Sequence, residues 1–244
     1  QSARDQRQEW TTVGTALTTY GAAVTGLGAL VLNTGINYNS LRQTATQALT
    51  AVTGSTEDAA YQMQRLDQYG QNSWLMRDTL IQAKQTMTGF GIETSKVIPY
   101  MDALAEATAA TGGSNQDFLE LAQVMGQIQS QGRITARELD RFGQRGIDAA
   151  GLIADAMGLT AGQIRDEIST GAFDAQTALD ALAQGMADRY GGASDLVRQT
   201  WRGAVDDVMA AFRDLSAAIA SPLVDPEGGG ILVGLANQVA DTMR

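Results

Sequence analysis

The chain has 244 residues, and its 17 Lys and Arg residues against 27 Asp and Glu residues give a net charge of −10. It contains no Cys and no His, which excludes thiol and imidazole catalysis, disulfides and ordinary zinc sites. So acidic a chain is also a poor candidate for general binding to a phosphate backbone, which needs a local excess of Lys and Arg.

The first predicted element is a long helix within residues 1–54. No charged residue lies between Glu9 and Arg42, a run of 32 positions. Apolar residues follow one another at intervals of 4, 3, 4, 3 and 4, the seam spacing of a left-handed coiled coil. They are Val13, Leu17, Tyr20, Val24, Leu27 and Val31, and the phase continues through Tyr38, Leu41, Ala45, Ala48 and Val52. The spacing predicts a coiled-coil-like helix.

Glycines recur every seven residues beside this seam, at Gly14, Gly21, Gly28 and Gly35. Each lowers helix propensity by about 1 kcal/mol relative to Ala, but a line of glycines lets a second helix approach closely. The window 13–32 has borderline hydropathy for a membrane span. Three interpretations stay open: a helix in a tight soluble bundle, an oligomerising helix that can enter a bilayer, and a disordered linker.

Short amphipathic helices with recognisable ends are predicted from residue 55 onward. Candidate N-caps are Ser55, Ser114, Thr135, Thr160, Asp174 and Ser194. Candidate stops are Gly70, Gly89, Gly91, Gly112 with Gly113, Gly132, Gly158, Gly171, and Gly191 with Gly192. No segment rich in β-branched residues shows a sustained alternation of apolar and polar positions, so we predict an all-α fold with no significant sheet.

Three apolar stripes at helical spacing are predicted to face a core. They are Phe118, Leu121, Val124, Met125 and Ile128; Leu179, Leu182, Met186 and Tyr190; and Trp201, Val205, Val208, Met209, Phe212, Leu215 and Ile219. Prolines and glycines after Ser221 predict a flexible joint. We therefore expect three parts: the long helix at 1–54, a compact multi-helix domain at 55–223, and a joint with the start of another segment at 224–244.

Residues 152–164 resemble a helix-turn-helix. In a DNA-binding protein the second helix would enter the major groove, where Asp166 and Glu167 would be repelled by phosphates. The sequence therefore favours a plain corner between two helices over DNA recognition.

Four arginines recur every four residues, at Arg133, Arg137, Arg141 and Arg145. Two interpretations stay open: a solvated face with local ion pairs, and a strip that docks an acidic partner. Arg133, Arg137 and Arg141 are the candidate docking residues.

No catalytic constellation is visible. Asp206 and Asp207 are adjacent, so on a helix their side chains diverge. Ser95 and Lys96 lack the Ser-x-x-Lys spacing, and the Gly-Gly pairs lack the Lys and Ser or Thr of a phosphate-binding loop. We therefore predict no catalytic, cofactor-binding or metal-binding residues, no cofactor, and a chain that is not an enzyme.

Several short motifs, in this order and spacing, resemble the conserved domain of phage tail tape measure proteins over residues 53–223. They lie at residues 53–59, 89–91, 107–112, 121–134, 138–139, 145–147, 152–158, 171–173 and 190–193, followed by a helix that ends at Ser221, Pro222 and Leu223. One departure is Asp148, where relatives often have Pro.

The resemblance implies a protein that lies inside the tail tube, takes part in tail assembly and sets tail length. It also implies release at infection, with hydrophobic segments helping to form a passage for DNA across the host membrane. The implied partners are further copies of the chain, as a trimer, together with tail tube and tail-tip proteins. The resemblance does not imply binding to a specific nucleic-acid sequence. The implied locations are the virion tail and, during infection, the host cell membrane. The competing class is an acidic regulatory or DNA-binding protein with a helix-turn-helix.

Overall fold

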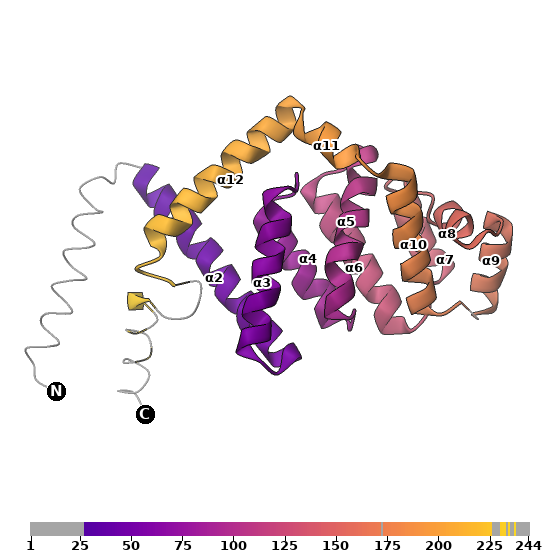
Figure 1. Ribbon diagram of the computed structural model, residues 1–244, viewed down its shortest axis with the longest axis horizontal. Helices are drawn as coiled ribbons and strands as arrows, with labels where there is room; N and C mark the ends of the chain where they lie inside the picture. The colour runs from indigo at the N-terminus through magenta and orange to yellow at the C-terminus, as the bar shows by residue number, and fades with distance from the viewer. Residues whose placement is uncertain (1–26, 172, 226–229, 233, 235–236, 238–244) are drawn as a thin grey trace, which may run out of the picture. The chain divides into compact units, whose positions relative to one another are not determined.

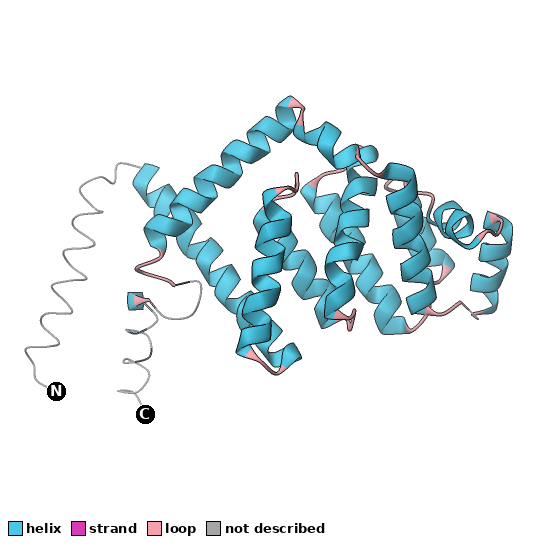
Figure 2. Ribbon diagram, in the orientation of Figure 1, coloured by secondary structure: helices cyan, strands magenta, loops and turns pink. Residues whose placement is uncertain are grey.

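The structure is a computed structural model that describes residues 27–171, 173–225, 230–232, 234 and 237 (Figure 1). Within these residues no strand forms, and the only extended pairing is an isolated bridge between Arg133 and Asp174 (Figure 2). The predicted all-α fold is confirmed. The helices are α2 (Leu27–Thr53), α3 (Thr56–Gln71), α4 (Arg77–Gly89), α5 (Thr94–Ala110), α6 (Asn115–Gln131), α7 (Ala136–Gly143), α8 (Ala149–Met157), α9 (Ala161–Thr170), α10 (Ala175–Tyr190), α11 (Ala193–Arg198) and α12 (Trp201–Ala220).

The chain divides into two compact units. One is residues 47–207, and the other is formed by the described parts of residues 1–46 and 208–244. Helices α2 and α12 each run from one unit into the other.

The core of unit 47–207 is built by α4, α5, α6, α8 and α10. The predicted core stripe on α6 is fully buried, and the stripe on α10 is buried at its first three positions. Tyr190, the last residue of that stripe, is half-buried at the end of α10. The 3.6-residue spacing thus predicted the inner faces of both helices.

Most predicted N-caps are confirmed by hydrogen bonds to their side chains. The Asp58 N–H donates to Ser55 at 3.1 Å, and the Asp117 N–H donates to Ser114 at 3.2 Å. The other confirmed caps are Thr160, which accepts from the Gln163 N–H, and Asp174, which accepts from the Thr177 N–H. At Thr135 the carboxylate of Glu138 accepts from the Thr135 N–H at 3.1 Å, the reverse half of a capping box.

One predicted helix start and one predicted helix stop are wrong. Ser194 is not an N-cap, because α11 already begins at Ala193 after Gly192, whose φ of 87° is left-handed. The Ser194 N–H instead donates to a Glu106 oxygen at 3.0 Å, a tertiary contact that local spacing does not encode. Gly70 does not stop α3, which runs one residue further, to Gln71.

A polar cluster joins α5 to α10. Lys96 forms an ion pair of 2.7 Å with Asp180, which also accepts hydrogen bonds from Tyr100 and Gln176. Burial would raise the pKa of Asp180, but the hydrogen bonds from Lys96, Tyr100 and Gln176 outweigh it and lower the pKa. Burial, followed by the contact with Asp180, raises the pKa of Tyr100.

A lysine is buried in the same unit. Lys84 on α4 is 1% exposed, and its Nζ donates to the backbone oxygen and to Oε1 of Gln62, each at 3.0 Å. Neither acceptor is charged, so the ammonium has no ion-pair partner among the described residues. Burial, followed by repulsion from Arg65, lowers the pKa of Lys84 to about 8.

In the second unit, α2 packs closely against α12 through small residues. A Cβ built on Gly35 would lie 1.9 Å from the carbonyl oxygen of Ser216 and 2.7 Å from the Cβ of Ala220. Asn39, which is buried, donates from Nδ2 to the carbonyl oxygens of Ala217 and Val224, each at 3.0 Å. The bond to Ala217 joins α2 to α12, and the bond to Val224 joins α2 to the segment that follows α12.

The predicted apolar seam of α2 coincides with the buried face of the helix only in part. Tyr38 and Ala45 are buried as predicted, but Ala48 is exposed and Val52 is 57% exposed. Leu49, one residue after Ala48, is buried instead. The seam therefore holds at Tyr38 and Ala45, in the unit where Gly35 meets α12, and fails at Ala48 and Val52, which belong to unit 47–207.

The prediction that the apolar stripe of α12 faces a core is wrong at Val208, Met209 and Leu215, and the side chains of Trp201 and Val205 lie outside the described part of the chain. Val208 is 68% exposed, Met209 45% and Leu215 59%, while Phe212 and Ile219 are half-buried. The buried face of α12 carries Ser216 and Ala220, because these small residues allow the close approach to Gly35.

Candidate functional site

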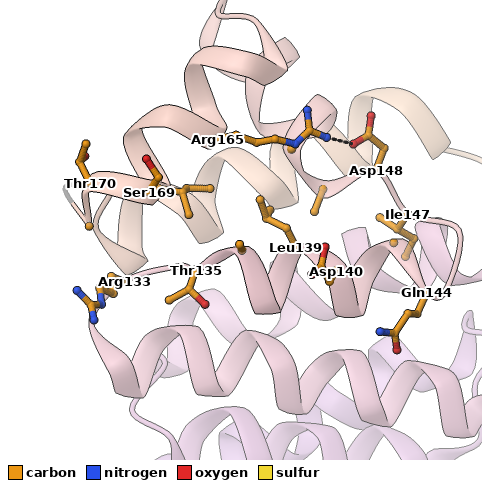
Figure 3. Close-up of a pocket in the computed structure, with 16 residues that line it drawn as sticks. Arg133, Thr135, Leu139, Asp140, Gln144, Ile147, Asp148, Arg165, Ser169 and Thr170 are labelled. Carbon is orange, nitrogen blue, oxygen red and sulfur yellow. Dashed lines mark ion pairs between the residues drawn. The ribbon is translucent and has the colours of Figure 1, made fainter.

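A groove of about 910 Å³ lies between α7, α8 and α9 (Figure 3). Apolar side chains of Leu139, Ile147 and Ile168 contribute to its lining. Arg133 lies near the end of α9 and Arg165 extends from α9 over the groove. Polar side chains complete the lining, among them Thr135, Asp140 and Ser169, so the groove is mixed in character.

Arg165 is only weakly paired. Its guanidinium lies 3.9 Å from a carboxylate oxygen of Asp148, and both side chains are more than half exposed. Because solvent screens such a pair, it contributes little to stability. Asp148 has a stronger role as the N-cap of α8, since its side chain accepts from the Gly151 N–H at 3.1 Å.

The four regularly spaced arginines do not form one helical strip, because α7 spans only Ala136–Gly143. Arg133 precedes α7 and takes part in the isolated bridge to Asp174, where the Ala175 N–H donates to the carbonyl oxygen of Gly132. Its side chain is exposed, as is that of Arg137 on α7.

The other two arginines have partners within the chain. Arg141 on α7 donates to Oε1 of Gln127. Arg145 follows α7 and pairs with Asp117 and Glu120 on α6. Local pairing therefore accounts for these two, while Arg133, which lines the groove, and Arg137 on α7 present their charges to solvent.

The predicted corner between two helices is formed by α8 and α9. Gly158 ends α8 in the left-handed region, with φ 68°, and Thr160 with Gln163 begins α9 as a capping box. Asp166 and Glu167 are both exposed on α9. This helix would therefore bring two carboxylates to any DNA in front of it. Within the described part of the chain, no group of three or more acidic side chains is arranged to hold a metal ion.

The predicted oligomer or membrane helix is only partly described. Val13, Gly14, Leu17, Tyr20, Gly21 and Val24 lie outside the described residues. Leu27 and Gly28 lie in the first turn of α2, Val31 is half-buried, and Gly35 contacts α12. No helix in the part of the chain that the structure describes is both long and apolar enough to cross a bilayer.

A family model described as "Tape measure protein" matches residues 33–221, which is most of the chain. The chain belongs to the tape measure protein family. The resemblance drawn from the short motifs is thereby confirmed, and the tape measure domain begins inside α2, about twenty residues before the predicted start at 53.

A tape measure protein of Lactococcus phage F4-1 is 23% identical over 165 residues. The aligned region covers 65% of this chain and 45% of that relative, so the chain spans about half the length of the curated relative it matches. No solved structure matches. The family match supports a fragment of a phage tail tape measure protein.

Sequence reasoning missed two features of the tape measure domain. It did not predict the groove, because the groove depends on how α7, α8 and α9 pack together. It also did not predict the exposed stripe of α12, although a signal was present. Residues 201, 205, 208, 212, 215 and 219 have the same 4, 3, 4, 3, 4 spacing as residues 13–31.

Proposed function

We propose that this chain is a segment of a phage tail tape measure protein that lies inside the tail tube and sets tail length during assembly. The observation that carries the proposal is the family match over residues 33–221, supported by an all-helical structure. A helix converts chain length into physical length at about 1.5 Å per residue. A protein made largely of helices can therefore act as a ruler.

The two kinds of segment in the chain should contribute differently to length. Unit 47–207 folds helices of six to seventeen residues back on one another, so it adds little length per residue. We propose that this unit positions the protein in the tail, and that extended helical parts of the same protein measure length.

In-frame deletions in the gene of a phage that carries this sequence test the proposal. A deletion in an extended helical part should shorten the tail by about 1.5 Å per deleted residue. Deletion of residues 47–207 should stop assembly or change tail length far less than that ratio. Electron microscopy of purified virions measures tail length, and a protein absent from virions would contradict the proposal.

The proposed partners are tail tube and tail-tip proteins and further copies of the chain, which we propose to be three. Parallel copies fit a tube with rotational symmetry. The candidate docking residues for an acidic partner are Arg133 and Arg137, because both side chains are exposed, and Arg133 lines the groove. Arg141 is a weaker candidate, since Gln127 already binds it.

We further propose that the protein leaves the tail at infection and acts at the host membrane. The supporting observation is the uncharged run at residues 10–41, because an uncharged segment avoids the large free-energy cost of placing charge in lipid. A peptide covering residues 7–42 should become helical and permeabilise lipid vesicles. Failure to bind vesicles would exclude this role.

We propose no enzymatic activity and no sequence-specific DNA binding. The proposal that the chain does not bind DNA sequence-specifically rests on Asp166 and Glu167. Both are exposed on α9, the helix that would enter the major groove of DNA. A gel shift with duplex DNA at physiological salt should show no complex. A salt-resistant shift would favour the alternative function, an acidic DNA-binding regulator.

A further inference from the structure

Helix α3 is held in unit 47–207 by a small buried face. Of its 16 residues only Ala59, Met63 and Leu66 are buried, whereas α6 buries seven of its 17. Helix α3 packs mainly against α4, while α4 also packs against α5 and α6. Segments with few buried apolar contacts can open locally while the rest of a protein stays folded. The packing therefore allows α3 to open without the other helices.

The contact between α3 and α4 also encloses a charge. Lys84 on α4 is 1% exposed, and its Nζ donates to the carbonyl oxygen and to Oε1 of Gln62 on α3, each at 3.0 Å. Both acceptors are neutral. Burial of an ammonium group that has only neutral acceptors costs free energy, and that cost disappears when the group returns to water. Separation of α3 from α4 removes both acceptors and lets water reach the ammonium.

The charged groups near Lys84 add to this cost. Burial, followed by repulsion from Arg65 on α3, lowers the pKa of Lys84 to about 8. On α6, which packs on another side of α4, the carboxylates of Asp117 and Glu120 are already paired with Arg145. They therefore offer Lys84 no compensating charge.

A second polar contact of α3, with α5, gathers like charges. The Tyr69 hydroxyl near the end of α3 forms a hydrogen bond with Asp102 on α5. Burial, followed by repulsion from Glu106 one turn further along α5, raises the pKa of Asp102. Burial, followed by the charge of Asp102, raises the pKa of Tyr69. Neither polar contact of α3 thus pairs opposite charges, and both resist closure of the helix onto the unit.

We propose that α3 opens from unit 47–207 as a separate segment, and that the return of the Lys84 ammonium to water drives this opening. The segment ends before Trp74, which is buried and whose Nε1 donates to the carbonyl oxygen of Ala105 at 3.4 Å. The Met76 N–H likewise donates to Oδ1 of Asn115 at 2.9 Å, so the start of α4 stays in place. Unfolding of the unit then begins at α3, while α5, α6 and α10 remain packed.

The opening depends on pH in a defined direction. The pKa of Lys84 is about 8 when α3 is closed and 10.5 ordinarily, so the open state binds more protons between these values. Opening is therefore most favourable below pH 8 and becomes less favourable as the pH rises. Between pH 7 and pH 9 the opening constant should fall about tenfold. Tyr69, whose ordinary pKa is 10.0, contributes only above this window.

Amide hydrogen exchange of the 244-residue chain at pH 7 and pH 9, measured by mass spectrometry, tests the proposal. The opening constant is the observed exchange rate divided by the rate of the same sequence unfolded at the same pH, which removes the direct effect of pH on exchange. At pH 7 the interior amides of α3 should have opening constants about tenfold or more above those of α6 and α10. Equal constants in the three helices, or an α3 constant that does not fall by pH 9, would overturn the proposal.

A pair of substitutions on α3 isolates the contribution of Lys84. Gln62→Glu places a carboxylate where the ammonium already donates, so the α3 opening constant at pH 7 should fall about tenfold. The matched control is Gln64→Glu, which adds the same charge at an exposed position of the same helix and should leave the constant unchanged. Lys84→Met, which removes the ammonium, should abolish the fall between pH 7 and pH 9. Equal effects of the two Glu variants, or an unaltered pH dependence in Lys84→Met, would show that Lys84 does not drive the opening.

Discussion

Gly35 on α2 and Ser216 on α12 approach so closely that a Cβ at position 35 would lie 1.9 Å from the Ser216 carbonyl oxygen. Only glycine fits there without a shift of one backbone against the other. The seven-residue glycine line predicted that a second helix would approach this face, and at Gly35 that second helix is α12 of the same chain.

Gly35→Ala should therefore loosen α2 from α12, although Ala is the better helix former. Overpacking costs about 1–3 kcal/mol, which exceeds the gain of about 1 kcal/mol in helix propensity. Hydrogen exchange measured by mass spectrometry should show faster exchange of α12 amides near Ser216. The control is Gly162→Ala on α9, where the only neighbour of a new Cβ lies 3.9 Å away, so this change should slow exchange or leave it unaltered. Slower exchange in both variants would contradict the close packing.

Lys84 predicts a pH dependence of stability. Its pKa is about 8 in the folded protein against 10.5 ordinarily, so the unfolded chain binds more protons between these values. Stability should rise with pH across that window, and the full penalty of about 3 kcal/mol should be present below pH 8. Urea unfolding at pH 7, 8, 9 and 10 measures the rise.

The control for that experiment is Lys84→Met, which keeps the length of the side chain and removes the ammonium. Its free energy of unfolding should lack the rise between pH 8 and 10. Tyr69 and Tyr100, whose pKa values burial raises, are the same in both proteins, so their loss of stability at higher pH cancels in the difference. Parallel pH profiles would show that Lys84 is not the cause.

The arginine docking surface is tested by charge reversal. Arg133→Glu with Arg137→Glu should reduce incorporation of the protein into virions if an acidic partner docks beside the groove. The control is Arg189→Glu on α10, where the arginine is also exposed and only weakly paired, with Asp155 at 3.7 Å. Quantitative mass spectrometry of virions gives the incorporated amount. Normal incorporation of the double variant would exclude docking at these residues.

Local features of this fold could be predicted from the sequence, because their physics lies within four residues. The caps at Ser55, Ser114 and Asp174 depend on a side chain and a backbone N–H three positions later. The core stripes of α6 and α10 depend on helical spacing inside one helix. The predictions at these positions hold.

Features that depend on the neighbour of a helix could not be predicted in this way. The apolar stripe of α12 has the spacing of a core face, yet Ser216 and Ala220 form the contact with α2. The reason is that the facing residue on α2 is Gly35, which admits only small neighbours. Burial of Lys84 likewise depends on Gln62 of another helix. At the candidate site, the arginine spacing predicted a strip, but α7 ends at Gly143 and divides it.

The most direct test of the central claim is tail length in phage whose gene for this protein carries an in-frame deletion in an extended helical segment. Deletion of about 60 codons should shorten the tail by about 90 Å, at 1.5 Å per helical residue. An insertion of equal length should lengthen the tail by the same amount. Tails of unchanged length, in virions that contain the shortened protein, would contradict its role as the ruler.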